Sequence, residues 1–184
     1  MEQRVILGID PGSNQMGWAI LSVEQKRLRP VEIGVLELSK IKDPFIRLER
    51  IFNEVCNLIV TYAPGELAVE APFYGKNVQS MLKLGRAQGM AIAAALAHKI
   101  AVFEYAPRKV KLSITGRGAA SKEQVANMLH KTIEMVMAPV KWDATDALAV
   151  AVCHYYQSQN PVKEKGVAKT WEAFLSQHPH RIKK

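Results

Sequence analysis

One stretch constrains the fold more than any other: the apolar run at residues 5–9, which ends on Asp10 and a Pro11-Gly12 turn. An apolar run this short, closed by Pro-Gly, predicts a β-strand that is buried on both faces of a sheet. Asp10 then lies at the carboxyl end of a central strand, where open α/β sheets place their ligand sites. The simpler alternative is a turn aspartate that bonds only the backbone of Gly12.

The rest of the sequence alternates between strand and helix patterns. Apolar or alternating segments predict further strands at residues 16–23, 30–38, 67–70 and 101–105. Periodicity and helix-start signals predict helices at residues 44–62, 78–98 and 143–157, with shorter ones after Pro107 and Ser121. This α/β order matches ribonuclease-H-like folds: a five-stranded mixed sheet, three antiparallel strands and then two parallel ones, flanked by helices.

Composition indicates a soluble globular protein with an anionic partner. The 184 residues carry a net charge of +8, which favours nucleic acid as that partner. Residues 161–184 hold six basic and two acidic residues, so we expect one domain at residues 1–160 and a basic C-terminal appendage. No transmembrane-length stretch or secretory signal is found, which predicts a cytoplasmic protein. Cys56 and Cys153 fall in apolar helical patterns and are expected to be reduced core residues.

Four carboxylates are candidates for chemistry. Asp10 and Glu70 each close a short buried strand, so both lie at one edge of the sheet if the two strands are parallel neighbours. Asp143 and Asp146 are three residues apart at the start of a helix and share one face. The helix dipole alone would also favour acidic residues there, and Asp143 is a plausible N-cap.

A cluster of carboxylates needs a neutralising partner, because like charges raise one another's pKa. Two Mg²⁺ ions about 3.5–4 Å apart would neutralise them, activate a water and stabilise the leaving oxygen in phosphodiester cleavage. No histidine or cysteine stands nearby in motif spacing, so zinc is disfavoured. The pattern predicts a two-metal site at Asp10, Glu70, Asp143 and Asp146, with Mn²⁺ as a substitute ion.

An aromatic and basic loop follows Glu70. Phe73 and Tyr74 stand beside Lys76 and Asn77, and aromatic residues among basic ones suit stacking on unpaired bases. The alternative is that Phe73 packs in the core. We expect a phosphate track lined by the basic residues Lys83, Arg86, Arg108, Lys111, Arg117 and Lys122.

The helix expected at residues 78–98 carries small residues at a spacing of four: Gly85, Gly89, Ala93 and Ala97. Such a face permits close approach of another element. It packs either on the protein's own sheet or on a second copy of the helix in a homodimer, and the sequence leaves both open.

Several segments together carry a family resemblance. They are Gly8-Ile9-Asp10-Pro11-Gly12-Ser13, Glu70 before Phe73-Tyr74-Gly75-Lys76-Asn77, Leu82-Lys83-Leu84-Gly85-Arg86-Ala87, Phe103-Glu104-Tyr105 and Asp143-Ala144-Thr145-Asp146-Ala147-Leu148-Ala149. In this order and spacing, over about residues 4–158, the chain resembles the RuvC family of bacterial Holliday-junction resolvases (crossover junction endodeoxyribonucleases). The Asp-Pro-Gly-Ser motif alone is weak, since actin-like ATPases carry a similar loop.

The resemblance implies a ribonuclease-H-like nuclease domain at residues 1–160, a homodimer and a Mg²⁺-dependent endonuclease of DNA recombination and repair. Such enzymes bind four-way junctions and make paired, symmetric nicks that leave 5′-phosphates. The four carboxylates match metal-binding residues, Phe73 matches an aromatic residue that stacks near the crossover, and Lys111 and Lys122 match basic residues beside the active site. The branch-migration proteins RuvA and RuvB are implied as partners. Tyr74, Gly75 and residues 115–120 depart from the family pattern, which leaves the preferred cleavage sequence open.

Two other classes of protein remain open from the sequence. An actin-like ATPase shares the Asp-x-Gly loop but needs a second phosphate loop and an adenosine-binding segment, for which 184 residues leave little room. A non-catalytic junction-binding module would use the carboxylates only for a structural ion. Magnesium-dependent nicking of a junction distinguishes a nuclease from both.

Overall fold

The computed structural model of the chain describes residues 4–72, 77–133 and 142–159. Within these ranges the strands form one sheet in the order β3-β2-β1-β4-β5. The first three strands pair antiparallel, whereas β4 lies parallel to β1, and β5 parallel to β4. The predicted ribonuclease-H-like mixed sheet is therefore confirmed. Its strands are β1 (Arg4–Asp10), β2 (Gln15–Glu24), β3 (Arg27–Glu37), β4 (Glu66–Glu70) and β5 (Ala101–Tyr105).

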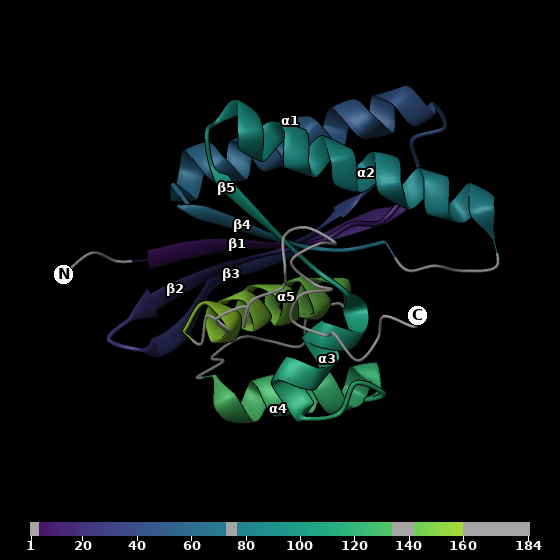
Figure 1. Ribbon diagram of the computed structural model, residues 1–184. Coiled ribbons are helices and arrows are strands. Elements are labelled where there is room, and N and C mark those ends of the chain that lie inside the picture. Colours follow the sequence, from purple (N-terminus) through teal and green to yellow (C-terminus); the bar gives the residue numbers. More distant parts are fainter. Residues whose placement is uncertain (1–3, 73–76, 134–141, 160–184) are drawn as a thin grey trace, which may run out of the picture.

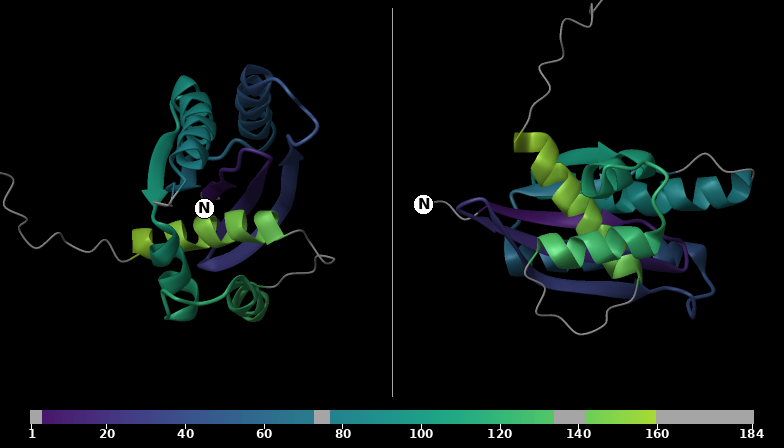
Figure 2. Two further views of the ribbon diagram at one scale, coloured as in Figure 1. Left: turned by 90° about the vertical axis from the view of Figure 1, so that its right-hand side faces the viewer. Right: turned by 90° about the horizontal axis from the view of Figure 1, so that it is seen from below.

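Helices cover both faces of the sheet (Figure 1). On one face lie α1 (Pro44–Tyr62) and α2 (Val78–Ala97), and on the other lies α5 (Trp142–Gln159). The remaining helices, α3 (Pro107–Thr115) and α4 (Lys122–Thr132), pack against α5 on its outer side, as the two turned views of Figure 2 also show. Because the sheet is covered on both sides, β1 is buried throughout its centre: Ile6 packs under α5, and Leu7 packs under α1 and α2.

Small residues allow α5 to lie directly on β1 and β2. A Cβ atom added at Gly8 would stand 2.9 Å from the Cβ of Ala151, and one added at Gly17 would overlap the backbone carbonyl of Asp143. On the helix side, Ala144 and Ala147 are fully buried in the same contact. This close approach brings the beginning of α5 to the carboxyl end of β1.

Local signals in the sequence account for the helix starts. The side chain of Asp43 accepts a hydrogen bond from the backbone N–H of Phe45 at 2.7 Å, and Pro44 is the first helical residue. At the helix start predicted after Ser121, this residue forms a capping box with Gln124: each side chain accepts a hydrogen bond from the other residue's backbone N–H, at 3.3 and 3.0 Å.

The structure decides two points that the sequence left open. The last helix begins at Trp142, so Asp143 lies inside its first turn and is not an N-cap. The small-residue face of α2 does not pack on the protein's own sheet, because a Cβ atom at Gly85 or Gly89 would meet nothing within 4 Å. The helix instead buries another face toward the core, formed by Ala87, Gln88, Ala91, Ala94 and Ala95.

Other predictions fare differently. Cys153 is buried as expected, but Cys56 is only partly so. Strand β3 begins at Arg27, before the predicted residue 30, because the β2–β3 hairpin closes tightly through Gln25 and Lys26, both with positive φ. The appendage at residues 161–184 lies outside the described residues. Within the described ranges, no helix combines the length and the hydropathy that crossing a membrane requires.

Candidate active site

Two carboxylates lie at the carboxyl edge of the sheet. β1 ends at Asp10 and β4 ends at Glu70, and the parallel register that pairs Ile9 with Val69 places these strand ends side by side. The backbone carbonyl of Glu70 accepts a hydrogen bond from the side-chain amide of Gln88 in α2 at 3.2 Å. This contact ties the end of β4 to the helical layer on the opposite side from α5.

The beginning of α5 brings two further carboxylates to this edge. One oxygen each of Asp10, Asp143 and Asp146 lies within 4.8 Å of the other two. All three are hard oxygen donors, so the set fits a hard divalent cation such as Mg²⁺ or Mn²⁺. The structure thus gathers three of the four predicted carboxylates in one tight group, with Glu70 next to it at the end of β4.

Burial and mutual repulsion govern the charge state of this group. Burial raises the pKa of Asp10 to about 8, and the negative charges of Glu70 and Asp146 add to the effect. Burial raises the pKa of Glu70 to about 7, again with a contribution from Asp146. A neighbouring cation would favour the ionised form of both groups.

Two lysines provide part of that positive charge. Lys122 is the first residue of α4, and the capping box at Ser121 fixes its backbone. Its ammonium group forms an ion pair with Asp146 at 2.5 Å. Partial burial would lower the pKa of Lys122, but the hydrogen bond to Asp146 and the charges of Asp146, Asp10 and Asp143 outweigh it and raise the pKa. Lys111 of α3 acts on Glu70 and lowers its pKa.

Gln15 and Gly17 belong to the site but were missed from the sequence. The side-chain amide of Gln15, the first residue of β2, donates a short hydrogen bond to the carboxylate of Asp143. Gly17 provides the space in which the Asp143 backbone lies. The sequence offered one signal for these residues, the predicted antiparallel pairing of the first two strands. In the structure this pairing sets Gly17 opposite Asp10.

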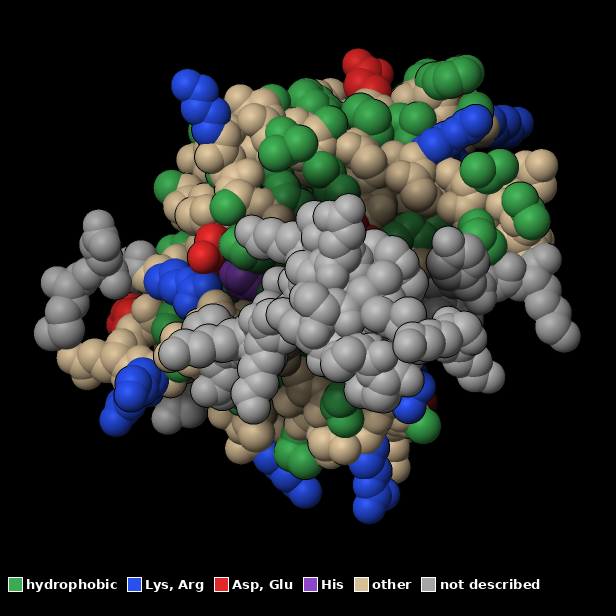
Figure 3. Space-filling view, in the orientation of Figure 1, with side chains coloured by type: hydrophobic (Ala, Val, Ile, Leu, Met, Phe, Trp, Pro, Cys, Tyr) green, Lys and Arg blue, Asp and Glu red, His purple; other side chains and the backbone are tan. Residues whose placement is uncertain are grey.

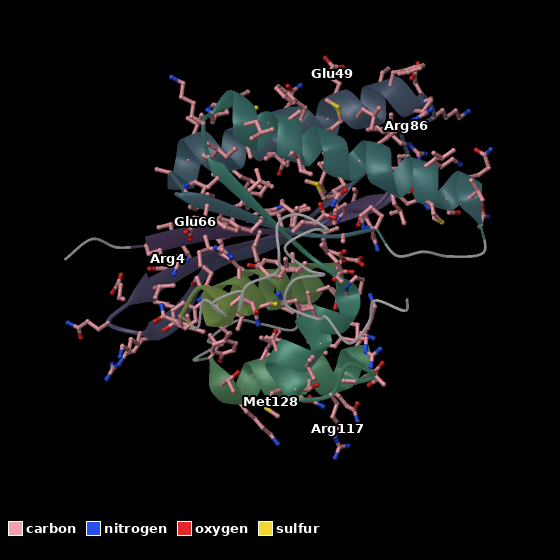
Figure 4. All side chains as sticks on the ribbon, viewed as in Figure 1. Arg4, Glu49, Glu66, Arg86, Arg117 and Met128 are labelled. Atoms are coloured by element: carbon pink, nitrogen blue, oxygen red, sulfur yellow. The ribbon has the colours of Figure 1, made fainter. Side chains whose placement is uncertain are left out.

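The structure describes seven of the ten predicted DNA-binding residues, and these lie in α2, α3 and α4 or next to them. Phe73, Tyr74 and Lys76 lie outside the described residues. Asn77 uses its side-chain oxygen to cap α2, accepting from the N–H of Ser80 at 3.1 Å. In Figure 4, Arg86 projects from the α1–α2 layer and Arg117 from the opposite layer. The exposed basic residues of the predicted track are Lys83, Arg86, Arg108, Arg117 and Lys122, whereas Lys111 is partly buried.

Comparison with known proteins gives a consistent result. The family model of "Crossover junction endodeoxyribonuclease RuvC" matches residues 6–154. The protein of that name from Cytophaga hutchinsonii is 51% identical over 180 residues, which cover 98% of this chain and 88% of the relative. The one from Bacteroides fragilis is 49% identical, with 100% of this chain and 98% of the relative covered.

A solved structure extends the likeness to three dimensions. Thermus thermophilus RuvC in complex with Holliday junction substrate matches with a TM-score of 0.79 at 29% identity, over 86% of this chain and 96% of that one. The resemblance predicted from the motifs is confirmed. The chain belongs to the RuvC family of crossover junction endodeoxyribonucleases.

Proposed function

We propose that this protein is a DNA endonuclease that resolves four-way (Holliday) junctions by paired, symmetric nicks in DNA recombination and repair. The observation that carries the proposal is the convergence of Asp10, Asp143 and Asp146 at one edge of the sheet, in a member of the RuvC family. A relative of known structure is described in complex with a Holliday junction substrate. Nothing in these relationships supports an actin-like ATPase or a non-catalytic junction-binding module.

The proposed cofactor is Mg²⁺, with Mn²⁺ as a substitute. Asp10, Glu70, Asp143 and Asp146 would hold two ions, because the donors are carboxylates alone and such ligands suit hard cations. When bound, the ions would supply the Lewis acidity that a phosphodiester hydrolysis needs at the attacking water and at the leaving 3′ oxygen, a reaction whose products carry 5′-phosphates. We assign Asp10 as the central metal ligand, because the negative charges of Glu70, Asp143 and Asp146 all raise its pKa and thus lie close to it.

The chain's own side chains would hold the substrate in place. The raised pKa of Lys122 keeps its ammonium group protonated, and its ion pair with Asp146 fixes it beside the carboxylates, where it can bind the phosphate to be cut. Lys111 would bind a phosphate from the Glu70 side. Phe73 would stack on an unpaired base near the crossover. The remaining proposed DNA contacts are Tyr74, Lys76, Asn77, Lys83, Arg86, Arg108 and Arg117.

A homodimer is proposed because α2 presents an exposed apolar stripe. Val78 is 62%, Leu82 53% and Leu96 60% exposed, and they flank Gly85 and Gly89 at helical spacing. Figure 3 shows hydrophobic side chains gathered over this part of the surface. Side chains of this kind on one face mark an interaction surface. A two-fold dimer would present two active sites to a two-fold junction, which accounts for paired nicks.

The wider setting rests on the family relationship. RuvA and RuvB are proposed as partners because the RuvC family implies them, and a cytoplasmic location is proposed for the same reason. The division into a nuclease domain at residues 1–160 and a basic appendage at residues 161–184 is kept as a proposal from the charge distribution.

The direct test uses a synthetic four-way junction labelled on each strand in turn. We expect nicks at symmetric positions in two opposed strands in the presence of Mg²⁺, and none in EDTA or on a linear duplex of the same sequence. Junction binding without nicks in either Mg²⁺ or Mn²⁺ would favour the binding module. ATP hydrolysis, measured in the same samples, would favour the ATPase.

A further inference from the structure

We propose that Gln15 and Arg47 form a positioning pair for the carboxylate of Asp143. Gln15 holds this carboxylate toward Asp10 and Asp146, and Arg47 holds the turn that places Gln15. The inference rests on the proposed function, because it assigns to both residues a part in shaping the proposed metal site. Neither residue belongs to the carboxylate set.

The contact between Gln15 and Asp143 joins two distant parts of the chain. Gln15 opens β2, directly after the turn that follows Asp10, whereas Asp143 lies in the first turn of α5. The Gln15 amide N–H donates a hydrogen bond to Oδ2 of Asp143. A carboxylate on the first turn of a helix has several rotamers open to it, and a donor from the neighbouring strand selects one of them. Groups that orient a metal ligand in this way tune the affinity of the site.

Arg47 fixes the turn from the other side. It lies in the first part of α1, and its guanidinium group donates to three backbone carbonyls in two loops. Nη1 bonds to the carbonyl of Ser13 at 3.0 Å and to the side-chain oxygen of Asn14 at 3.1 Å. Nε bonds to the carbonyl of Ile41 at 2.5 Å, and Nη2 to that of Ser39 at 3.4 Å. Only a planar guanidinium fork can make this set of bonds at once.

These contacts place Gln15 through the backbone. Ser13 and Asn14 directly precede Gln15, and the carbonyl of Asn14 also accepts the N–H of Leu38 at 2.8 Å, so the turn is tied both to the residue that follows β3 and to α1. Within the described part of the chain Arg47 makes no hydrogen bond or ion pair with Asp143, so it acts through the turn and Gln15. If so, the effects of removing Arg47 and Gln15 must overlap.

The test measures Mn²⁺ binding to the full chain without DNA, by the electron paramagnetic resonance signal of free Mn²⁺. We expect Gln15→Met, which keeps the length of the side chain and removes the donor, to weaken Mn²⁺ binding about tenfold. Gln15→Asn, which keeps the amide but shortens its reach, should do the same. Arg47→Met should weaken binding by a similar factor and Arg47→Lys by less. Arg50→Met, an exposed change on the same helix, is the matched control and should stay within about twofold of wild type.

The double variant gives the decisive result. Residues that act as one unit have non-additive effects, so Gln15→Met/Arg47→Met should bind Mn²⁺ within about twofold of Gln15→Met alone. A loss equal to the product of the two single losses would overturn the pairing, and unchanged Mn²⁺ binding by both Gln15 variants would overturn the role of Gln15. Junction affinity should be unchanged in all variants. Failure of the proposed function gives a different result, because wild-type protein would then leave a four-way junction uncut in Mg²⁺ and Mn²⁺ whatever the Mn²⁺ affinities of the variants.

Discussion

Gly17 of β2 lies against the backbone carbonyl of Asp143 so closely that a methyl group at Gly17 would overlap it. The strand pairs Gly17 with Asp10 across the sheet, so one residue without a side chain both faces the end of β1 and admits the start of α5. The distance between Asp10 and the α5 carboxylates is therefore set by packing of backbone on backbone. This makes the site sensitive to substitutions that carry no charge.

Gly17→Ala should damage the site and the fold together. The added methyl group must push the first turn of α5 off the sheet, which we expect to cost about 1–3 kcal/mol of unfolding free energy. Urea unfolding measures this loss, and the thermal stabilisation given by Mn²⁺ should shrink at the same time because Asp143 moves. Gly65→Ala is the matched control, since a Cβ atom there meets nothing within 4 Å. A Gly17→Ala protein with wild-type stability and Mn²⁺ response would contradict the packing argument.

Asp10→Asn should stabilise the protein in the absence of metal. Burial and neighbouring negative charges raise the folded-state pKa of Asp10 from its ordinary 3.8 to about 8, so the folded state binds more protons than the unfolded state between these values. Stability is therefore lost as pH rises through this window, and a neutral amide removes the loss. We expect the melting temperature in EDTA at pH 8 to rise by about 3 °C or more.

The control for this change is Glu49→Gln, which neutralises an exposed carboxylate on α1 (Figure 4). It should leave the melting temperature in EDTA nearly unchanged. With saturating Mg²⁺ the order should reverse, and wild type should melt above Asp10→Asn. An Asp10→Asn protein that melts below wild type in EDTA would show that the ionised carboxylate of Asp10 does not destabilise the folded state.

Much of the fold could be predicted because its signals are local. Asp43-Pro44 and the Ser121/Gln124 capping box mark helix starts within four residues of sequence, and the apolar run before Asp10 has the length of a buried strand. The carboxylates could be singled out because each stands at the end or start of such an element. Asp10 and Glu70 could be expected at one edge of the sheet because the ribonuclease-H-like strand order makes their strands parallel neighbours.

The supporting contacts could not be predicted because they depend on which elements touch. Gln15 meets Asp143 across 128 positions of sequence, and Arg47 reaches Ser13 across 34. Nothing in the local sequence distinguishes Arg47 from the exposed Arg50. The same limit applies to α2, where small residues at a spacing of four indicate close packing but not the direction in which it occurs.

The exposed stripe on α2 should hold the dimer together. Leu82→Glu and Leu96→Glu place charges on that stripe, and each should shift the protein toward a monomer in size-exclusion chromatography with light scattering. On a junction, the monomer should leave singly nicked products, because the second nick then requires a separate encounter. Val60→Glu, a change at a 73% exposed apolar residue of α1, is the control. A dimer that survives both α2 changes would place the interface elsewhere.

A buried histidine network should make stability fall on the acid side. His154 of α5 is 1% exposed, and it bonds to the hydroxyl of Tyr105 at 2.7 Å and to Glu66 at 3.2 Å. Arg4, which pairs with Glu66 at 2.7 Å, stands next to them (Figure 4). Burial lowers the pKa of His154, and Arg4 adds to this, although the hydrogen bond with Glu66 opposes it.

The sign follows from that shift. Below pH 6.5 the unfolded chain takes up a proton at His154 that the folded protein resists. The contribution of His154 to the unfolding free energy therefore decreases as the pH is lowered, by at most about 1.4 kcal/mol per pH unit for one proton. Because Asp10 and Glu70 titrate in the same range with the opposite sign, urea unfolding in EDTA between pH 7.5 and 5 compares wild type with His154→Gln, and wild type should lose more, or gain less, unfolding free energy than the variant as pH falls. The exposed His98→Gln serves as control and should keep the wild-type slope. Equal slopes in wild type and His154→Gln would contradict the account.

The central claim is that the carboxylates at the sheet edge cut DNA and do not merely bind it. The most direct measurement compares cleavage and binding of one four-way junction by wild type, Asp10→Asn and Glu70→Gln, with Mg²⁺ for cleavage and EDTA for binding. We predict that both variants bind the junction within about threefold of wild type but cleave it about a thousandfold more slowly or not at all, because each loses a charged ligand and no phosphate contact. Near-normal cleavage by either variant would contradict the assignment of the active site.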